Sequence, residues 1–390
     1  MSVELFGTAA PGFDRVADAF AMGFEGKPTM GAALAIRHEG RLVVDLWGGV
    51  RDERTDSPWL EQTPSVIFSC TKGIVSILAA RLVQDGRLDY QAPVADYWPE
   101  FAAAGKAGVL VKDLLSHRSG LSAPREPLGT ADIIDWDTVV TALAAQRPLW
   151  EPGAGYAYHA ITHGWLVGEM IRRVTGQSIG EYFAELIAAP LHADAWIGLP
   201  TGVHARVAHM QVGSTLAQLT AQQAAARSPG VTDWGELAMT LGGALPPELV
   251  GDTEGFNDPV VQSAEIPGAG GIATARALAA IWSATVIDTA GVRLLDDETL
   301  ATAVVPQSEG APVWHVPGPW PRWGMGFQLD SEARRYLSSA SFGHDGAGGQ
   351  SAFADPDAKV GFAFLTNQME AIDDLRATRI IDALRSTLDA

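Results

Sequence analysis

The segment "FSCTKG", residues 68–73, leads into a run of apolar residues. Apolar side chains then recur with a helical period, and Gly86 is a natural C-terminal stop, so the pattern predicts a helix over 70–85. Ser69 and Lys72 lie three positions apart and therefore share one face at the start of this helix. The residues that follow offer little polar surface to a solvated lysine, which indicates a specific role for Lys72.

A serine and a lysine one turn apart can form a nucleophile and its proton partner. A serine hydroxyl is a poor nucleophile until a base removes its proton. Lysine can be that base only when it is partly neutral, and burial near a helix N-terminus lowers its proton affinity. The alternative is that Ser69 caps the helix and Lys72 lies on the surface.

The segment "GYAYHAITHGWLVGE", residues 155–169, supplies further titratable groups. A tyrosine near the start of a buried helix can act as a general base when an ammonium stabilises its phenolate, and Tyr156 and Tyr158 both fit by position. Packing of aromatic rings is the alternative. His159 and His163 have the i, i+4 spacing of a metal site, but no third ligand is in view, which favours a structural or substrate-lining role.

Two glycine-rich segments have different interpretations. In "FGHDGAGGQSAF", residues 342–353, small residues between two strand-like runs leave backbone N–H groups unobstructed. One such N–H and that of Ser69 would form a two-donor oxyanion hole, and a plain hairpin turn is the alternative. The segment "PGAGGIATAR", residues 267–276, lacks the lysine of a phosphate loop, so we interpret it as a loop with Thr274 as the helix cap.

Strand-like patterns occur at both ends of the chain. Residues 31–50 read as a hairpin around a His-Glu-Gly turn, and the last ninety residues contain several strand-like runs and a terminal helix. The middle of the chain is mostly helical. We therefore expect an α/β (α+β) fold: an antiparallel sheet built from residues 1–86 and 301–390, flanked by helices, with residues 87–300 as an inserted, mostly helical domain.

Composition limits the possible partners. The 390 residues include 27 basic and 46 acidic side chains, and the net charge of −19 disfavours nucleic acid and an anionic membrane surface. No secretory signal and no membrane-spanning stretch is visible, so we expect a cytoplasmic protein. Cys70 is the single cysteine, which excludes an intrachain disulfide. A Cys/His enzyme is disfavoured because Cys70 would face away from Ser69.

Taken together and in this order, the segments resemble the serine β-lactamase/penicillin-binding superfamily. The resemblance is closer to class C β-lactamases and closest to family VIII carboxylesterases, and it covers nearly the whole chain. Four further motifs carry it besides Ser69-x-x-Lys72: "LLSHRSGL" (114–121), similar to Leu-Leu-Ser-His-Thr-Ser-Gly-Leu; "WEPGAGYAYHA" (150–160), similar to Pro-Gly-x-x-x-x-Tyr-x-Asn; "GAGGIATARALA" (268–279), similar to Gly-Gly-x-x-Ser-Thr; and "GHDGAGG" (343–349), where lactamases have Lys-Thr-Gly.

Departures from the lactamase motifs point to the substrate class. The resemblance matches Tyr158 with the motif tyrosine, but Ala160 stands in the asparagine position and His344 in the position of the Lys-Thr-Gly lysine. In lactamases these two residues help to hold the lactam's side-chain amide and its carboxylate. Their loss favours esters without a carboxylate anchor, which is the family VIII pattern.

The resemblance implies a serine esterase that forms an acyl-enzyme on Ser69, with Lys72 and Tyr158 sharing proton transfer. The N–H groups of Ser69 and Ala347 would hold the oxyanion, and Gly346 and His344 would border the substrate. The expected partner is a small-molecule ester with a small or medium acyl chain, no metal or organic cofactor is implied, and the oligomeric state stays open. The alternatives are a β-lactamase or D-Ala-D-Ala peptidase, an acyltransferase on the same fold, and a non-catalytic scaffold.

Overall fold

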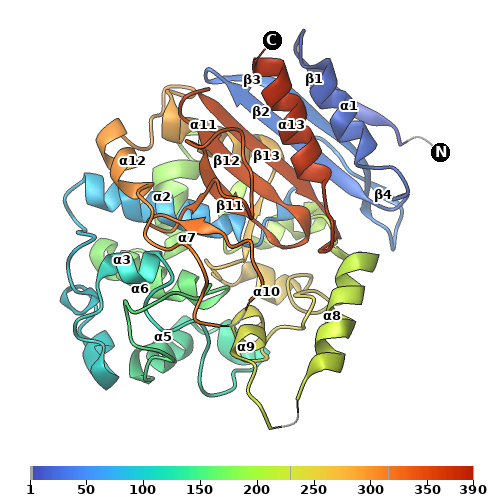
Figure 1. Cartoon of the computed structure of the whole chain (residues 1–390). Helices are drawn as coiled ribbons and strands as arrows, with labels where there is room; N and C mark the ends of the chain where they lie inside the picture. Colours follow the sequence, from blue (N-terminus) through green and yellow to red (C-terminus); the bar gives the residue numbers. More distant parts are fainter. Residues whose placement is uncertain (1–2, 229, 315, 390) are drawn as a thin grey trace.

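The computed structural model describes residues 3–228, 230–314 and 316–389 (Figure 1). Within these residues the main sheet has the strand order β1-β3-β2-β13-β12-β11-β10-β9, with β4 paired to β3, and its pairs are antiparallel. Its strands are β1 (Leu5–Ala9), β2 (Gly31–His38), β3 (Arg41–Asp52), β4 (Ser57–Pro58), β9 (Arg322–Trp323), β10 (Gln328–Leu329), β11 (Phe342–Asp345), β12 (Ser351–Asp355) and β13 (Val360–Thr366). The helices are α1 (Asp14–Met22), α2 (Cys70–Gln84), α3 (Val111–Leu115), α4 (Thr130–Ile133), α5 (Trp136–Ala145), α6 (Thr162–Thr175), α7 (Ile179–Phe183), α8 (Ser214–Ala226), α9 (Trp234–Thr240), α10 (Pro259–Ser263), α11 (Ala275–Val286), α12 (Asp297–Ala303) and α13 (Arg376–Leu388).

The two ends of the chain meet at the centre of the sheet. Strand β2 pairs with β13 in antiparallel register, from Ala32 opposite Thr366 to His38 opposite Val360. The expected sheet built from both chain ends, with a mostly helical middle segment, is therefore confirmed. The boundaries of the inserted domain at residues 87 and 300 stay a prediction, and α11, which lies inside that range, packs on the sheet.

Helices cover both faces of the sheet (Figure 1). Helices α1 and α13 lie side by side on one face, where Phe362 and Phe364 of β13 enter their apolar core. Helix α11 crosses the other face, where β13 presents the small residues Gly361 and Ala363. A Cβ at Gly361 would lie 2.4 Å from the Ala279 carbonyl oxygen, so this face of β13 must carry small residues for α11 to approach.

The glycine-rich segment 267–276 differs from the expected loop. It contains strand β8 (Gly271–Ala273), which pairs with β5 (Ser65–Val66) and with β6 (Ala195–Ile197) in a small antiparallel sheet. Pairing with two distant strands overrides the local preference of the glycines for a turn. The helix cap was predicted correctly, because the Thr274 side chain accepts a hydrogen bond from the Ala277 N–H.

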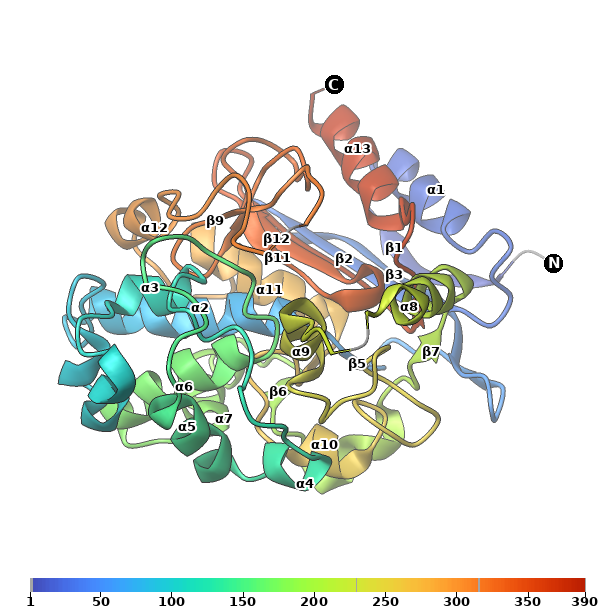
Figure 2. The same ribbon diagram turned by 60° about the horizontal axis from the view of Figure 1, so that its bottom comes forward.

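The helical part of the molecule adjoins the sheet at the start of α2. Figure 2 shows α2 running above α6, with α8 and α9 below β11 and β12. Helix α2 contacts α6 and β11 and is buried along almost its whole length, so its first turn lies where sheet and helices meet. In the part of the chain that the structure describes, no helix has the length and apolar character needed to cross a bilayer.

Candidate active site

Ser69 occupies the N-cap position of α2, and its side chain makes no capping hydrogen bond to the described residues. Strand β5 positions Ser69, because the chain that follows it is fixed to β8 by a 2.9 Å hydrogen bond from the Ile67 N–H to the Gly271 carbonyl. The preceding residue, Phe68, has a φ of +43°, in the left-handed region, and its ring packs edge-on against Phe256 at 5.5 Å. Ser69 is half-buried, so its hydroxyl is accessible and not consumed in capping.

Lys72 is fully buried, and the alternative of a surface lysine is wrong. Its Nζ lies 3.0 Å from Ser69 Oγ, 2.5 Å from the Ala160 carbonyl oxygen and 2.7 Å from the Gly268 carbonyl oxygen. Burial lowers the pKa of Lys72 well below that of a solvated lysine. The two carbonyl oxygens accept N–H groups from either protonation state, so they hold the nitrogen in place whether or not it carries a proton.

The two carbonyl partners of Lys72 were not foreseen from the sequence. They meet because α6 and the segment before β8 approach each other without side chains between them. A Cβ at Gly164 would lie 2.0 Å from the Gly268 nitrogen, and one at Gly268 would lie 2.2 Å from the Ile161 carbonyl oxygen. The glycines themselves are the signal in the sequence, since both permit a close backbone approach.

Tyr158, and not Tyr156, lies beside the serine and the lysine. Lys72 Nζ is 4.9 Å from the centroid of the Tyr158 ring, which stacks on Trp323 at 5.2 Å with an interplanar angle of 13°. Burial raises the pKa of Tyr158, and the adjacent Ser69 hydroxyl acts in the opposite direction. Tyr156 instead donates a 2.6 Å hydrogen bond to the Gly310 carbonyl.

Buried histidines form the back of the site. His117 packs against His159 and His163, at 5.5 and 5.0 Å between ring centroids, and against the edge of the Tyr158 ring at 5.0 Å. His159 Nδ1 donates to the Ala157 carbonyl at 2.7 Å, and its Nε2 accepts from the backbone. Burial lowers the pKa of His159 to about 4. These backbone partners fit a structural role, and the described residues contain no group of three or more ligands arranged for a metal ion.

The end of β11 packs directly against the start of α2. The Cys70 thiol donates a 3.0 Å hydrogen bond to the His344 carbonyl, so Cys70 faces the sheet. A Cβ at Gly346 would lie 2.4 Å from the Ile67 carbonyl oxygen, which shows how closely the glycine loop, residues 345–350, approaches the chain before the serine. Among the described residues, neither the Ser69 N–H nor the Ala347 N–H donates a hydrogen bond to another protein group.

His344 has a defined tautomer. Its Nδ1 lies 2.6 Å from the Asp345 carbonyl oxygen, which can only accept, so Nδ1 carries the proton. Burial lowers the pKa of His344 to about 3. The neutral ring therefore has an acceptor at Nε2, which is buried without a partner in the described residues. The ring lies 5.3 Å from Trp323 and 6.1 Å from Tyr158, between centroids.

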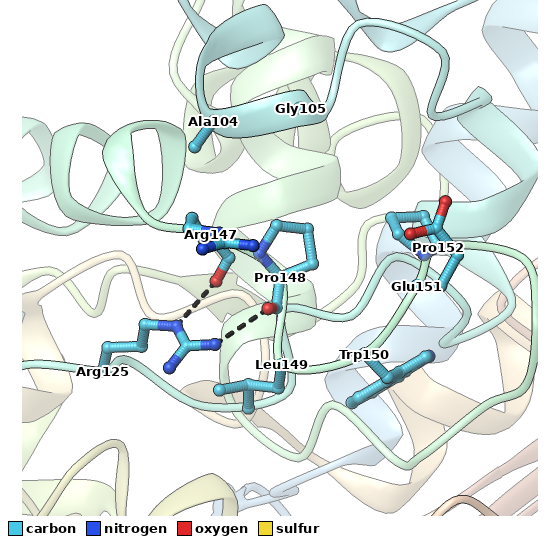
Figure 3. A pocket seen from close by; sticks show the side chains of 9 residues that line it. All are labelled: Ala104, Gly105, Arg125, Arg147, Pro148, Leu149, Trp150, Glu151 and Pro152. Carbon is cyan, nitrogen blue, oxygen red and sulfur yellow. Dashed lines mark hydrogen bonds between the residues drawn. The ribbon is translucent and has the colours of Figure 1, made fainter.

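A separate cavity of about 620 Å³ lies against the loop before Tyr158 (Figure 3). The guanidinium of Arg125 donates there to the carbonyls of Arg147 and Pro148, at 2.8 and 2.9 Å. Trp150, in the wall of this cavity, packs on His159 at 5.8 Å between ring centroids. None of the predicted site residues lines this cavity, so it is distinct from the serine site.

Comparison with known proteins agrees with this geometry. The family model described as Beta-lactamase matches residues 17–385. The chain belongs to the beta-lactamase family. The resemblance and the fold class expected from the motifs are therefore confirmed.

Individual relatives cover nearly the whole chain. The chain is 34% identical over 377 residues to "Esterase/beta-lactamase LipL" of Mycobacterium tuberculosis (strain ATCC 25618 / H37Rv), a match that covers 94% of this chain and 83% of that protein. A crystal structure of a family VIII carboxylesterase is 35% identical, with a TM-score of 0.84, over 98% of this chain and all of the other. A penicillin-binding protein homologue from Caulobacter crescentus is 34% identical, with a TM-score of 0.85 and the same coverage.

Proposed function

We propose that this protein hydrolyses small carboxylic esters through an acyl-enzyme on Ser69. The observation that carries the proposal is the position of Lys72 Nζ, 3.0 Å from Ser69 Oγ and held by two backbone carbonyls. The names of the relatives, esterase and carboxylesterase, support the same reaction class. The prediction of a serine carboxylesterase is confirmed at the level of the reaction class, and the roles of individual residues are proposals.

The acceptors around Lys72 explain how it takes the serine proton. A neutral lysine amine has two N–H groups and one lone pair. The Ala160 and Gly268 carbonyls accept the two N–H groups, which leaves the lone pair for the hydroxyl of Ser69. Burial lowers the pKa of Lys72, so the neutral amine is accessible. Ser69 Oγ attacks the ester carbonyl as its proton passes to Nζ.

Tyr158 then completes the first half of the reaction. Because burial raises the pKa of Tyr158, the phenol keeps its proton near neutral pH and can give it to the departing alkoxide. The C–O bond to the alcohol breaks, and the Lys72 ammonium returns a proton to the phenolate. Water repeats the sequence in reverse: it loses a proton to the lysine–tyrosine pair, attacks the acyl carbon, and Ser69 regains its hydrogen.

The oxyanion would be held by the N–H groups of Ser69 and Ala347. Both are free of protein acceptors in the described residues, and each such donor contributes about 3 kcal/mol in comparable enzymes. His344 takes a different role in this proposal. Its buried Nε2 is an acceptor and would repel an oxyanion, so we place it on the side of the leaving alcohol or the attacking water.

Removal of the nucleophile tests the proposal. Wild type and Ser69→Ala are compared on p-nitrophenyl butyrate, with intact mass measured after a slow ester and after a fluorophosphonate probe. We expect a mass increase equal to the acyl group in wild type only, and loss of turnover in Ser69→Ala. Retained turnover in the variant would refute the mechanism, and an unlabelled wild type would favour a non-catalytic scaffold.

A chromogenic cephalosporin tests the same-fold alternative. The asparagine and lysine positions that assist lactam binding are Ala160 and His344 here, so we expect the ester to be hydrolysed faster than the cephalosporin. The reverse order would identify a β-lactamase. Adding a small alcohol at increasing concentration checks for acyl transfer, because an acyltransferase would give the new ester in place of the free acid.

A further inference from the structure

A second feature of the site is a cavity of about 370 Å³ beside the glycine loop. Gly346 and Ala347 line it together with Leu216 and Leu219 of α8 and Met239 of α9. Figure 2 shows these two helices below β11 and β12. The volume falls in the range of small-molecule sites. Because Ala347 is the proposed oxyanion donor and lines this cavity, a chain bonded to the reacting carbonyl can extend from the serine site into it.

The position of Tyr158 decides which part of the ester occupies the cavity. The leaving alcohol must lie within reach of the Tyr158 phenol, which stacks on Trp323. Neither of these aromatic residues lines the cavity. The cavity therefore accommodates the acyl chain, and the alcohol leaves on the other side of the carbonyl.

The walls combine apolar side chains with carboxylates and with the guanidinium of Arg334. The apolar part suits a hydrocarbon chain and comes from Leu216, Leu219, Met239, Leu249 and Met369. Four carboxylates also line the cavity: Glu248, Asp345, Glu370 and Asp374. Three of them have a cation at 2.9 Å or less: Asp345 pairs with Arg334, Glu370 with Lys27, and Asp374 with Arg376.

Glu248 differs from the other three carboxylates. Its carboxylate accepts a 2.7 Å hydrogen bond from the Thr220 hydroxyl, and no basic side chain of the described residues lies within 4.0 Å of it. The side chain is half-buried, so solvent screens it only in part. Glu248 thus presents to the cavity a negative charge that no basic side chain of the described residues balances at close range, and this charge attracts a cation and repels a carboxylate.

We propose that this cavity selects acyl chains that carry a cationic amine at the far end, and that Glu248 determines this selectivity. The inference rests on the proposed function, because it assigns the cavity to the acyl half of an ester cleaved at Ser69. It adds a substrate class, ω-amino acyl esters, and a specificity-determining residue. It also predicts that ω-carboxy acyl esters are poor substrates.

Three p-nitrophenyl esters with the same leaving group test the inference: hexanoate, 6-aminohexanoate and the adipate monoester. Each kcat/KM is divided by the rate of hydroxide-catalysed hydrolysis of the same ester, which removes differences in intrinsic reactivity. We expect this corrected kcat/KM to be highest for the 6-aminohexanoate ester, lower for the hexanoate and lowest for the adipate monoester. The 6-aminohexanoate and hexanoate esters should differ by about fivefold. In Glu248→Gln the ratio of amine to neutral should fall to about one, and in Glu248→Lys the carboxylate should become the preferred ester.

Glu298→Gln is the matched control, because it removes the same charge from an exposed side chain of α12, far from α8 in Figures 1 and 2. It should leave the ratio unchanged. A second measurement needs no variant: raising the salt concentration should lower the amine-to-neutral ratio of wild type. An equal ratio in wild type and Glu248→Gln, or a salt-independent ratio, overturns the inference while ester hydrolysis stands. Absence of Ser69-dependent hydrolysis of the hexanoate ester overturns both.

Discussion

Lys72 and Lys106 are both fully buried lysines held by backbone carbonyls, and they differ in one acceptor. Lys106 Nζ donates to the carbonyls of Ala103, Ala144 and Gln146, at 2.6 to 2.8 Å. Lys72 Nζ has two carbonyls and, in the third position, the hydroxyl of Ser69. The Lys106 ammonium thus donates all three of its N–H groups to backbone carbonyls, whereas Lys72 also faces the Ser69 hydroxyl, which can lose a proton.

This difference predicts the outcome of paired substitutions. Lys72→Met and Lys106→Met each remove an ammonium and leave buried carbonyls without a donor, which costs about 1–3 kcal/mol of stability per unsatisfied group. Only Lys72→Met should lower kcat/KM for p-nitrophenyl butyrate, by about 100-fold or more, because it alone removes the proton acceptor. Activity is measured at a temperature where both variants are folded by circular dichroism. Equal losses of activity would show that Lys72 acts only as a structural tie.

The two tyrosines of the 155–169 segment provide a second matched pair. Tyr158→Phe keeps the ring on Trp323 but removes the phenol, whereas Tyr156→Phe removes a hydroxyl that donates to the Gly310 carbonyl. If Tyr158 protonates the leaving alcohol, its loss should lower kcat by about 10²- to 10⁴-fold for an alkyl ester and much less for a p-nitrophenyl ester, whose leaving group needs no proton. Tyr156→Phe should affect both esters slightly and equally. An equal loss on both esters in Tyr158→Phe would contradict the acid role.

The glycine loop gives a test of the oxyanion donors. In Gly346→Ala the new Cβ would meet the Ile67 carbonyl oxygen at 2.4 Å, so the loop must move away from the start of α2. We expect kcat to fall by about 100-fold, the effect of losing one oxyanion donor. Gly108→Ala is the control, because nothing lies within 4 Å of its Cβ position and the residue is exposed. Unchanged kcat in Gly346→Ala, with the protein folded, would exclude the Ala347 N–H as a donor.

The sequence predicts side chains better than it predicts backbone partners. The spacing of Ser69 and Lys72 places them on one face of a helix, and the period-two runs near both ends of the chain indicate a shared sheet. The carbonyls of Ala160 and Gly268 belong to residues whose identity says nothing about hydrogen bonding, so only the structure reveals them.

Contacts between distant segments are the other part that the sequence could not supply. The stack of Tyr158 on Trp323 joins the loop before α6 to the edge strand β9, and no local pattern connects the two. The burial of Lys72 could not be predicted either, because it results from the tertiary packing of other elements around α2. The residue types that carry the proposed chemistry could therefore be predicted from the sequence, whereas the protonation state of Lys72 could not.

Buried neutral histidines predict acid sensitivity. Burial lowers the pKa of His159 to about 4, below the value of about 6.5 for an unfolded chain. Between these values the unfolded state binds a proton that the folded state does not, so the free energy of unfolding decreases as the pH falls, by about 1.4 kcal/mol per pH unit for one such group. In His159→Gln the dependence should be shallower by that amount in this window, whereas His192→Asn, which changes an exposed histidine, should match wild type. Denaturant titrations across the pH range measure the slopes, and an unchanged slope in His159→Gln would mean that His159 is charged in the folded protein.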